Sequence, residues 1–356
     1  MPAKTFVKKK VVCIGGGTGT SVVINALNGK YDLSAVVAMF DSGCSTGQLR
    51  REFNLPPMGD LRQCLIALAK KKEIASLMRY RFERGFLKGH SLGNILLTAA
   101  ALEGKGMEKG LEKMEDILET GRKIFPATPA NSNLAVVLKN GRTVKGEEEM
   151  VNCPEISKKG IKKIFLFPRA KANPKALAEI KKADFIIIGP GKFYTSLIPN
   201  FLAEGLAEAV RKSKARKILI CNLMTQPGNT DDFTAEKFLS ETEKYLGGES
   251  IDYVVFNTKK PPSKVLSQAS KIFSGSKFVG YGPEILKEKK FIGADLLSEN
   301  LQKLNPADIL AKGVNRRTMI VHDQKKLAKT LLKIIDKKVG RSRASARFLK
   351  DYAHRF

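Results

Sequence analysis

Residues 10–21 read KVVCIGGGTGTS, and this stretch decides the fold. The short apolar run over residues 10–14 predicts a strand, and the glycines that follow it at once predict a tight turn. From Ser21 to Leu27 the apolar spacing is helical, and AVVAMF at 35–40 predicts a second strand. Strand, glycine-rich turn, helix and strand form one βαβ unit, which predicts a right-handed crossover over a parallel sheet.

The same alternation continues along most of the chain. Helical patterns dominate at about 60–83 and 94–120, and strands alternate with helices in the C-terminal half. The predicted elements there are helix 174–182, strand 184–189, helix 199–212, strands 217–222 and 252–257, and helix 323–336. This order predicts an α/β fold class, a Rossmann-like three-layer α/β/α core with a mostly parallel sheet.

A small β-rich insertion interrupts this order at about residues 125–168. NLAVVL at 133–138 leads into the turn residues Asn140 and Gly141, which favour a hairpin, and IKKIFLFP at 161–168 supplies another strand. We therefore predict one α/β domain over residues 1–336, with this insertion, and a basic C-terminal arm over 337–356.

Composition restricts the class of protein. The 356 residues are 43% hydrophobic, and no apolar run reaches the length of about 18 residues that a membrane helix needs. The N-terminal residues MPAKTFVKKK lack the apolar segment of a signal peptide. Five scattered cysteines form no C-x-x-C pair, so we expect a reduced cytoplasmic protein without structural zinc and without a membrane span.

The net charge of +28 has two interpretations. A positive field attracts nucleotides, nucleic acid or anionic membrane surfaces. A lysine-rich proteome produces the same excess without any such partner. Because the sequence has no motif that reads RNA or DNA, we expect nucleic acid to bind only non-specifically, through the basic surface.

Polar loops follow several of the predicted strands. In open α/β sheets, ligands bind outside the carboxyl ends of the strands, at the point where the strand order reverses. That rule gathers loops 15–20, 41–47, 189–196 and 222–231 at one edge of the sheet, which we call the rim.

The first loop, GGGTGT at 15–20, joins a strand to a helix. Its glycines allow a phosphate to approach the helix N-terminus closely. Thr20 stands where the dinucleotide fingerprint G-x-G-x-x-G has its third glycine, so the match is partial. A plain strand-to-helix turn is the alternative.

The second loop, FDSGCSTGQLR at 40–50, is rich in hydroxyl groups. Asp41 stands where dinucleotide enzymes keep the acid that binds a ribose hydroxyl. The hydroxyl groups and glycines after it suit a second anionic or polyhydroxyl group, or a magnesium ion on Asp41. Further on, Asp60 opens a helix two residues before Arg62, either as a plain cap or as a site residue.

Two later loops carry similar chemistry. GPGKFYTSLIPN at 189–200 presents Lys192, Tyr194 and Thr195 after a glycine turn, which suits a phosphate or a sugar. CNLMTQPGNTDD at 221–232 adds Asn222 and Thr225, whose amide and hydroxyl groups suit a base or a sugar.

GHSLGN at 89–94 matches the nucleophile-elbow pattern G-x-S-x-G. An elbow needs a buried strand before the serine, and ERGFLK at 83–88 does not provide one. The downstream histidines, His322 and His354, stand in no recognisable pattern with an acid. We therefore expect Ser91 not to be a nucleophile, and His90 to be either a helix-start histidine or a proton shuttle.

Taken in order, these loops resemble the gluconeogenesis-factor (YvcK-like) branch of the CofD-like superfamily. The resemblance runs from about Val11 to Asp336 and rests on many ordered motifs. They are IGGGTGTS, DSGCSTGQLR, PPMGDLRQCLIAL, GHSLGNILL, GRKIFPAT, GPGKFYTSLIPN, CNLMTQPGNTDDFTA, IDYVVFN and GADLL with HDQKKLA.

The resemblance implies two alternatives. The gluconeogenesis-factor branch binds UDP-sugars, notably UDP-N-acetylglucosamine, and affects carbon metabolism and cell shape without an established turnover. The transferase branch moves 2-phospho-L-lactate from a guanylyl-diphosphate donor to a deazaflavin with magnesium, for which Asp41 and Asp60 would hold the metal. GHSLGN and MTQPGNTD favour the first branch, so we expect a nucleotide-sugar-binding regulator, with a homodimer implied by analogy.

The expected ligand contacts come from loops at the rim. They are Gly15, Gly16, Gly17, Thr18 and Gly19 at the diphosphate; Asp41, Ser45 and Thr46 at hydroxyls or a metal; Lys192, Tyr194 and Thr195 at phosphate or sugar; and Asn222, Thr225 and Asn257 at the nucleoside.

Three positions depart from the family pattern. Ser42 replaces a second acid, which weakens the expected magnesium site, and Cys44 replaces a glycine. Val321 stands where the branch commonly has an arginine. Sugar specificity then depends on other residues, such as Arg316 or Arg317.

Overall fold

The computed structural model describes residues 8–40, 43–272, 275–299 and 320–337. Parallel strands form one sheet of seven, in the order β10-β9-β8-β7-β1-β2-β3. They are β1 (Lys10–Gly15), β2 (Asp32–Val37), β3 (Ile124–Pro126), β7 (Phe185–Ile188), β8 (Arg216–Ile220), β9 (Tyr253–Asn257) and β10 (Phe291–Ala294). The βαβ unit predicted from residues 10–40 is therefore confirmed.

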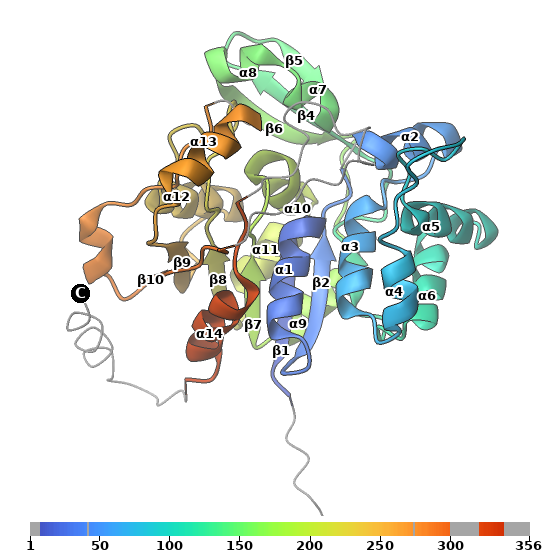
Figure 1. Cartoon of the computed structure of the whole chain (residues 1–356), viewed down its shortest axis with the longest axis horizontal. Coiled ribbons are helices and arrows are strands. Elements are labelled where there is room, and N and C mark those ends of the chain that lie inside the picture. Colours follow the sequence, from blue (N-terminus) through green and yellow to red (C-terminus); the bar gives the residue numbers. More distant parts are fainter. Residues whose placement is uncertain (1–7, 41–42, 273–274, 300–319, 338–356) are drawn as a thin grey trace, which may run out of the picture.

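Helices cover both faces of this sheet (Figure 1). One layer contains α1 (Gly17–Leu27), α3 (Gly59–Leu68), α5 (Leu92–Glu103), α6 (Met107–Leu118) and α14 (Gln324–Ile335). The other contains α9 (Pro174–Lys182), α10 (Ile198–Leu202), α11 (Leu206–Lys212) and α12 (Ala235–Leu246). Along β1, Val11 and Cys13 pack into the first core while Val12 and Ile14 pack into the second, as the two-residue period of a strand requires. The predicted three-layer α/β/α class is confirmed.

The strand order reverses between β1 and β7. From β1 the chain moves outward to β2 and β3, and it later returns to β7 on the other side of β1 before continuing to β8, β9 and β10. The loops after β1 and β7 therefore lie beside each other at the switch point, where open α/β sheets bind ligands.

A second, antiparallel sheet lies above the rim in Figure 1. It consists of β4 (Asn133–Leu138), β5 (Thr143–Lys145) and β6 (Ile161–Phe167), with α7 (Glu147–Val151) and α8 (Pro154–Lys159) between β5 and β6. A β-rich insertion is thus present. Its sheet begins at Asn133, because β3 before it pairs with β2 in the main sheet.

Several element boundaries differ from the sequence prediction. Residues predicted as a polar loop form α2 (Cys44–Phe53), whose composition is too polar to show a helical apolar pattern. The helix predicted over 199–212 is two helices, separated at Gly205, which adopts a left-handed φ of +93° that a helix interior does not allow. Further short elements are α4 (Lys72–Leu77), a π-helical turn (Phe193–Leu197), α13 (Ser263–Ile272) and a 3-10 turn (Pro283–Lys287).

None of the helices in the described ranges combines the length and the apolar character needed to cross a bilayer. The predicted basic arm lies outside the described residues beyond Lys337, as do Asp41, Ser42, Arg316 and Arg317.

Candidate functional site: the rim of the main sheet

Three helices begin at the rim without a capping side chain. The N-cap residues of α1, α2 and α3 are Gly16, Gly43 and Met58, which carry no side-chain oxygen. By contrast, α9 and α12 are capped in the usual way by Asn173 and Thr234. An uncapped helix start presents backbone N–H groups and the positive end of the helix dipole, which together attract anions.

Glycine lets the starts of α1 and α3 approach each other. A Cβ atom on Gly17 would lie 2.6 Å from both the Cα and the Oδ1 of Asp60, so a larger residue does not fit there. On the other side of α3, a Cβ on Gly59 would lie 2.2 Å from Thr46 Oγ1 in the first turn of α2. The first turns of α1, α2 and α3 therefore converge.

The loop after β7 closes against the same helix start. A Cβ atom on Gly19 would lie 1.8 Å from the carbonyl oxygen of Pro190, and Ser196 lies against Gly16. The prediction that loops 15–20 and 189–196 meet at the rim is confirmed for these residues.

A buried polar network supports the start of α2. Asn94 Nδ2 donates hydrogen bonds to Ser45 Oγ at 3.0 Å and to Thr46 Oγ1 at 3.4 Å. His90 Nδ1 lies 3.0 Å from Ser45 Oγ. Ser45 Oγ accepts the hydrogen bond from Asn94 and either donates to or accepts from His90 Nδ1, according to the tautomer of the neutral ring. Burial and the positive charge of Arg81 lower the pKa of His90 against the opposing effect of Glu52, which favours this neutral ring.

Ser91 has a structural role in this network. It is fully buried as the N-cap of α5, and its side chain accepts a hydrogen bond from the backbone N–H of Asn94 at 3.3 Å. Its backbone forms an isolated bridge with Arg81 and belongs to no strand of the main sheet. His322 lies elsewhere, bridged to Leu297. These contacts give Ser91 a capping role, which is consistent with the expectation that it is not a nucleophile.

The loop after β7 is tied to the insertion by an ion pair. Lys192 Nζ lies 3.3 Å from Glu147 Oε1, and the Glu147 side chain is only 4% exposed. The second oxygen of this carboxylate, Oε2, has no hydrogen-bond partner among the described residues. Arg51 of α2 also pairs with Glu148, so α7 touches both sides of the rim.

Two neighbours of Lys192 differ in their surroundings. Thr195 is buried in the π-helical turn, a feature frequent at functional sites, and its hydroxyl has no partner within the described ranges. The ring of Tyr194 instead packs edge-on against Phe193 and Tyr245, and burial raises the pKa of its hydroxyl, as does the charge of Glu241. The structure therefore places Thr195 in the buried turn but the Tyr194 ring against α12.

The three expected nucleoside contacts already have internal partners. Asn222 bonds through both atoms of its amide to the backbone of Gly191. Thr225 Oγ1 accepts a hydrogen bond from the Lys277 N–H at 2.9 Å. Asn257 Oδ1 accepts from the Leu296 N–H at 2.9 Å. Their role in fixing loops is observed, and their contact with a nucleoside stays a prediction.

The metal expectation rests on Asp41 and Asp60, of which only Asp60 lies in the described residues. No group of three or more His, Cys, Asp or Glu side chains that could hold a metal ion occurs in this part of the chain. Asp60 does place a carboxylate at the glycine turn, beside Gly16 and Gly17.

Sequence reasoning missed two residues of the rim. Asn94 stood in the quoted motif GHSLGN, but its contact with the start of α2 joins residues 49 apart. Glu147 opens the run EEE at 147–149, which is typical of a solvated helix start and gave no signal of burial against Lys192.

Comparisons with known proteins identify relatives over most of the chain. The family 2-phospho-L-lactate transferase CofD matches residues 11–300. A Thermotoga maritima protein named "Putative gluconeogenesis factor" is 37% identical over 332 residues, which cover 91% of this chain and 99% of that protein. A Bacillus subtilis protein named "Gluconeogenesis factor" is 37% identical over 262 residues, covering 72% of this chain and 81% of that protein.

A solved structure agrees with the fold. The crystal structure of a UPF0052 family member from Bacillus halodurans matches with a TM-score of 0.78 and 33% sequence identity. The match covers 91% of this chain and 99% of that one.

Proposed function

The chain belongs to the family of the 2-phospho-L-lactate transferase CofD, and we propose that it binds a nucleotide-sugar of the UDP-N-acetylglucosamine type at the rim. In this proposal it acts in the cytoplasm as a regulator of carbon metabolism or cell-envelope morphogenesis, without converting its ligand. The name that its relatives share, gluconeogenesis factor, supports a role in carbon metabolism.

The convergence of three helix starts supports the anion site. The first turns of α1, α2 and α3 meet through Gly17 with Asp60 and Gly59 with Thr46, and none of their N-cap residues carries a side-chain oxygen. A diphosphate needs several hydrogen-bond donors at once, and helix N-termini supply backbone N–H groups together with a favourable dipole.

Charge at the rim determines how such a ligand is held. The Asp60 carboxylate at the glycine turn repels the negative charge of a diphosphate, so binding a diphosphate there requires a positive charge beside the phosphates. Lys192 supplies an ammonium group on the adjoining loop. A magnesium ion, when bound, would neutralise charge between Asp60 and the phosphates, and this ion is usually held mainly by phosphates and water with one or two carboxylates.

Calorimetry and thermal unfolding of the purified protein test the proposal. UDP-N-acetylglucosamine, UDP-glucose and GDP are compared with and without magnesium. A ligand at a hundred times its Kd adds about 2.7 kcal/mol to the free energy of unfolding. We expect stabilisation by UDP-N-acetylglucosamine and recovery of the ligand intact. Failure of every nucleotide to bind refutes the proposal, and turnover of a GDP-linked donor would establish the transferase alternative.

A pair of variants tests the place of the ligand. Removing Lys192 alone would leave a buried Glu147 carboxylate without its partner, so the comparison starts from Glu147→Gln. Adding Lys192→Gln to that variant should weaken UDP-N-acetylglucosamine binding about tenfold or more, because hydrogen bonds to charged groups contribute about 1.5–3 kcal/mol. Lys182→Gln, the same change at an exposed position, should have no effect.

A further inference from the structure

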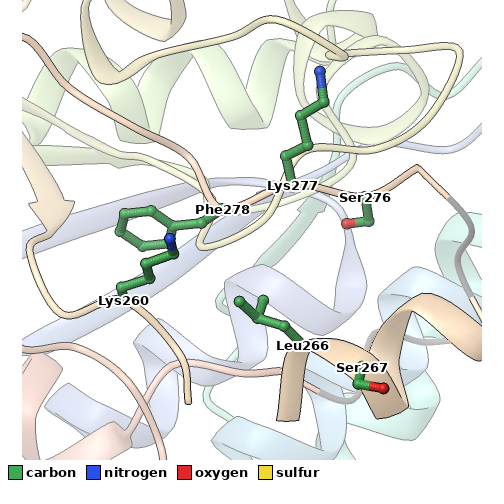
Figure 2. Close-up of a pocket in the computed structure, with 6 residues that line it drawn as sticks. All are labelled: Lys260, Leu266, Ser267, Ser276, Lys277 and Phe278. Carbon is green, nitrogen blue, oxygen red and sulfur yellow. The ribbon is translucent and has the colours of Figure 1, made fainter. Parts of the chain in front are cut away.

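A pocket of about 500 Å³ opens beyond the carboxyl ends of β8 and β9. Figure 2 shows the six residues that line it: Lys260, Leu266, Ser267, Ser276, Lys277 and Phe278. Its volume lies within the range of about 300–1,000 Å³ that is usual for small-molecule sites.

Two parts of the chain, joined to neighbouring strands, build this pocket. Lys260 follows β9, and Leu266 lies on α13 directly after it. The opposite wall is the segment 276–278, where Phe278 forms a bridge with Met224 in the loop that follows β8.

Thr225 fixes this second wall to the rim. Its N–H donates to the Lys277 carbonyl at 2.7 Å, and its Oγ1 accepts from the Lys277 N–H at 2.9 Å. Ser276 Oγ donates to the Thr225 carbonyl at 2.7 Å. The pocket therefore belongs to the same edge of the sheet as the glycine turn.

The lining combines a flat apolar surface with positive charge. Phe278 and Leu266 are half-buried, and Lys260 is exposed at the mouth. Lys277 Nζ lies 3.6 Å from Asp232, but both side chains are mostly exposed, so this ion pair is weak and easily exchanged. An aromatic face stacks on a planar base of any kind, while ammonium groups attract phosphate.

The spacing of the strands connects the pocket with the glycine turn. Neighbouring strands lie about 4.8 Å apart, so the pocket beyond β8 and β9 is two strand spacings, about 10 Å, from the switch point between β1 and β7. A nucleoside diphosphate can bridge that separation, with its phosphates at α1 and its base beyond β8.

We propose that this pocket binds the base and ribose of the nucleotide. The base stacks on Phe278, and the ammonium groups of Lys260 and Lys277 face the phosphates. The inference rests on the proposed function and adds the orientation of the ligand along the rim. The base lies beyond β8 and β9, and the diphosphate lies between β1 and β7. Asn222, Thr225 and Asn257 then act by holding the walls in place.

Calorimetric titration with two probes tests the assignment. UDP-N-acetylglucosamine occupies both parts of the rim, whereas inorganic pyrophosphate lacks a base and occupies the glycine turn alone. Phe278→Ala should weaken UDP-N-acetylglucosamine binding about tenfold, because the substitution removes the aromatic ring on which the base stacks. The same variant should leave the pyrophosphate affinity unchanged.

Lys260→Gln gives an independent measurement, because an exposed lysine can be replaced without unfolding the chain. It should weaken the nucleotide-sugar severalfold, and Lys264→Gln, an exposed lysine of α13 outside the lining, should not. If the wild-type protein binds UDP-N-acetylglucosamine and neither Phe278→Ala nor Lys260→Gln weakens it, the base lies elsewhere and the proposed function stands. If no nucleotide binds the wild-type protein, both proposals are refuted.

Discussion

Replacing Gly19 by alanine should separate the two loops that meet at the switch point. The added Cβ would lie 1.8 Å from the Pro190 carbonyl oxygen and 2.6 Å from its carbon. Both are backbone atoms, so no side-chain rotation relieves the contact. The start of α1 and the loop after β7 must then move apart by about 1.6 Å to restore an ordinary contact distance of about 3.4 Å.

The expected cost follows from this displacement. Overpacked cores lose about 1–3 kcal/mol, and a clash between two backbone segments should reach the upper end of that range. For a chain of 356 residues the entropy of unfolding is about 0.75 kcal/mol/K, so a loss of about 3 kcal/mol lowers Tm by about 4 °C. The same movement opens the diphosphate site, so UDP-N-acetylglucosamine binding should fall about tenfold or more.

The matched control stands in the same loop. A Cβ on Gly191 would meet only the Cβ of Ser196, at 4.0 Å, and its φ is not left-handed, so Gly191→Ala should leave the free energy of unfolding nearly unchanged. Unfolding is followed by circular dichroism in urea and by heating. Equal stability of Gly19→Ala and Gly191→Ala would refute the close approach of α1 to Pro190.

Three further predictions concern other parts of the molecule. Ser91→Ala should lower the free energy of unfolding by about 1 kcal/mol through loss of the α5 cap, measured in urea, and a serine-dependent esterase activity in the wild-type protein would contradict this role. Burial lowers the pKa of His322 from 6.5 to about 4. As the pH falls, this histidine is therefore protonated in the unfolded chain before it is protonated in the folded one, and the free energy of unfolding should fall by about 3 kcal/mol between pH 6.5 and pH 4. His322→Gln should flatten that pH dependence, and an identical slope in both proteins would be evidence against it. Glu147→Gln removes the buried carboxylate beside Lys192 and should raise the calorimetric affinity for pyrophosphate about fivefold or more, whereas unchanged affinity would show that Lys192 does not face the anion.

Much of the fold could be predicted from local sequence. β1, β7, β8 and β9 are apolar runs that end in glycine or polar residues, and this signal depends only on neighbouring residues. β3 (IFP) and β10 (FIGA) are short and include a proline or a glycine, so no apolar run marks them and they were not predicted. The polar helix α2 was also missed, because its position depends on contacts with α5 and the insertion and not on an apolar stripe.

The site could be predicted less completely, since its contacts are non-local. Glycine and hydroxyl residues showed which loops face a ligand, because those residue types are unusual in such density. The pairing of Lys192 with Glu147 joins residues 45 apart, and the wall that holds Phe278 depends on the bridge to Met224. Neither pairing leaves a pattern along the chain.

The internal bonds of the rim bear on how ligands would be distinguished. Backbone N–H groups at α1, α2 and α3 recognise negative charge, but they do not distinguish one nucleotide from another. The polar side chains of Asn222, Thr225 and Asn257 are occupied in holding loops. In the proposed arrangement Phe278 stacks on a base of any kind, so selection among bases requires a polar group of the pocket beyond β8 and β9, such as the Ser276 hydroxyl. Relatives that keep the glycine turn but lack an aromatic residue at the position of Phe278 should then bind the same diphosphate and hold the base less tightly.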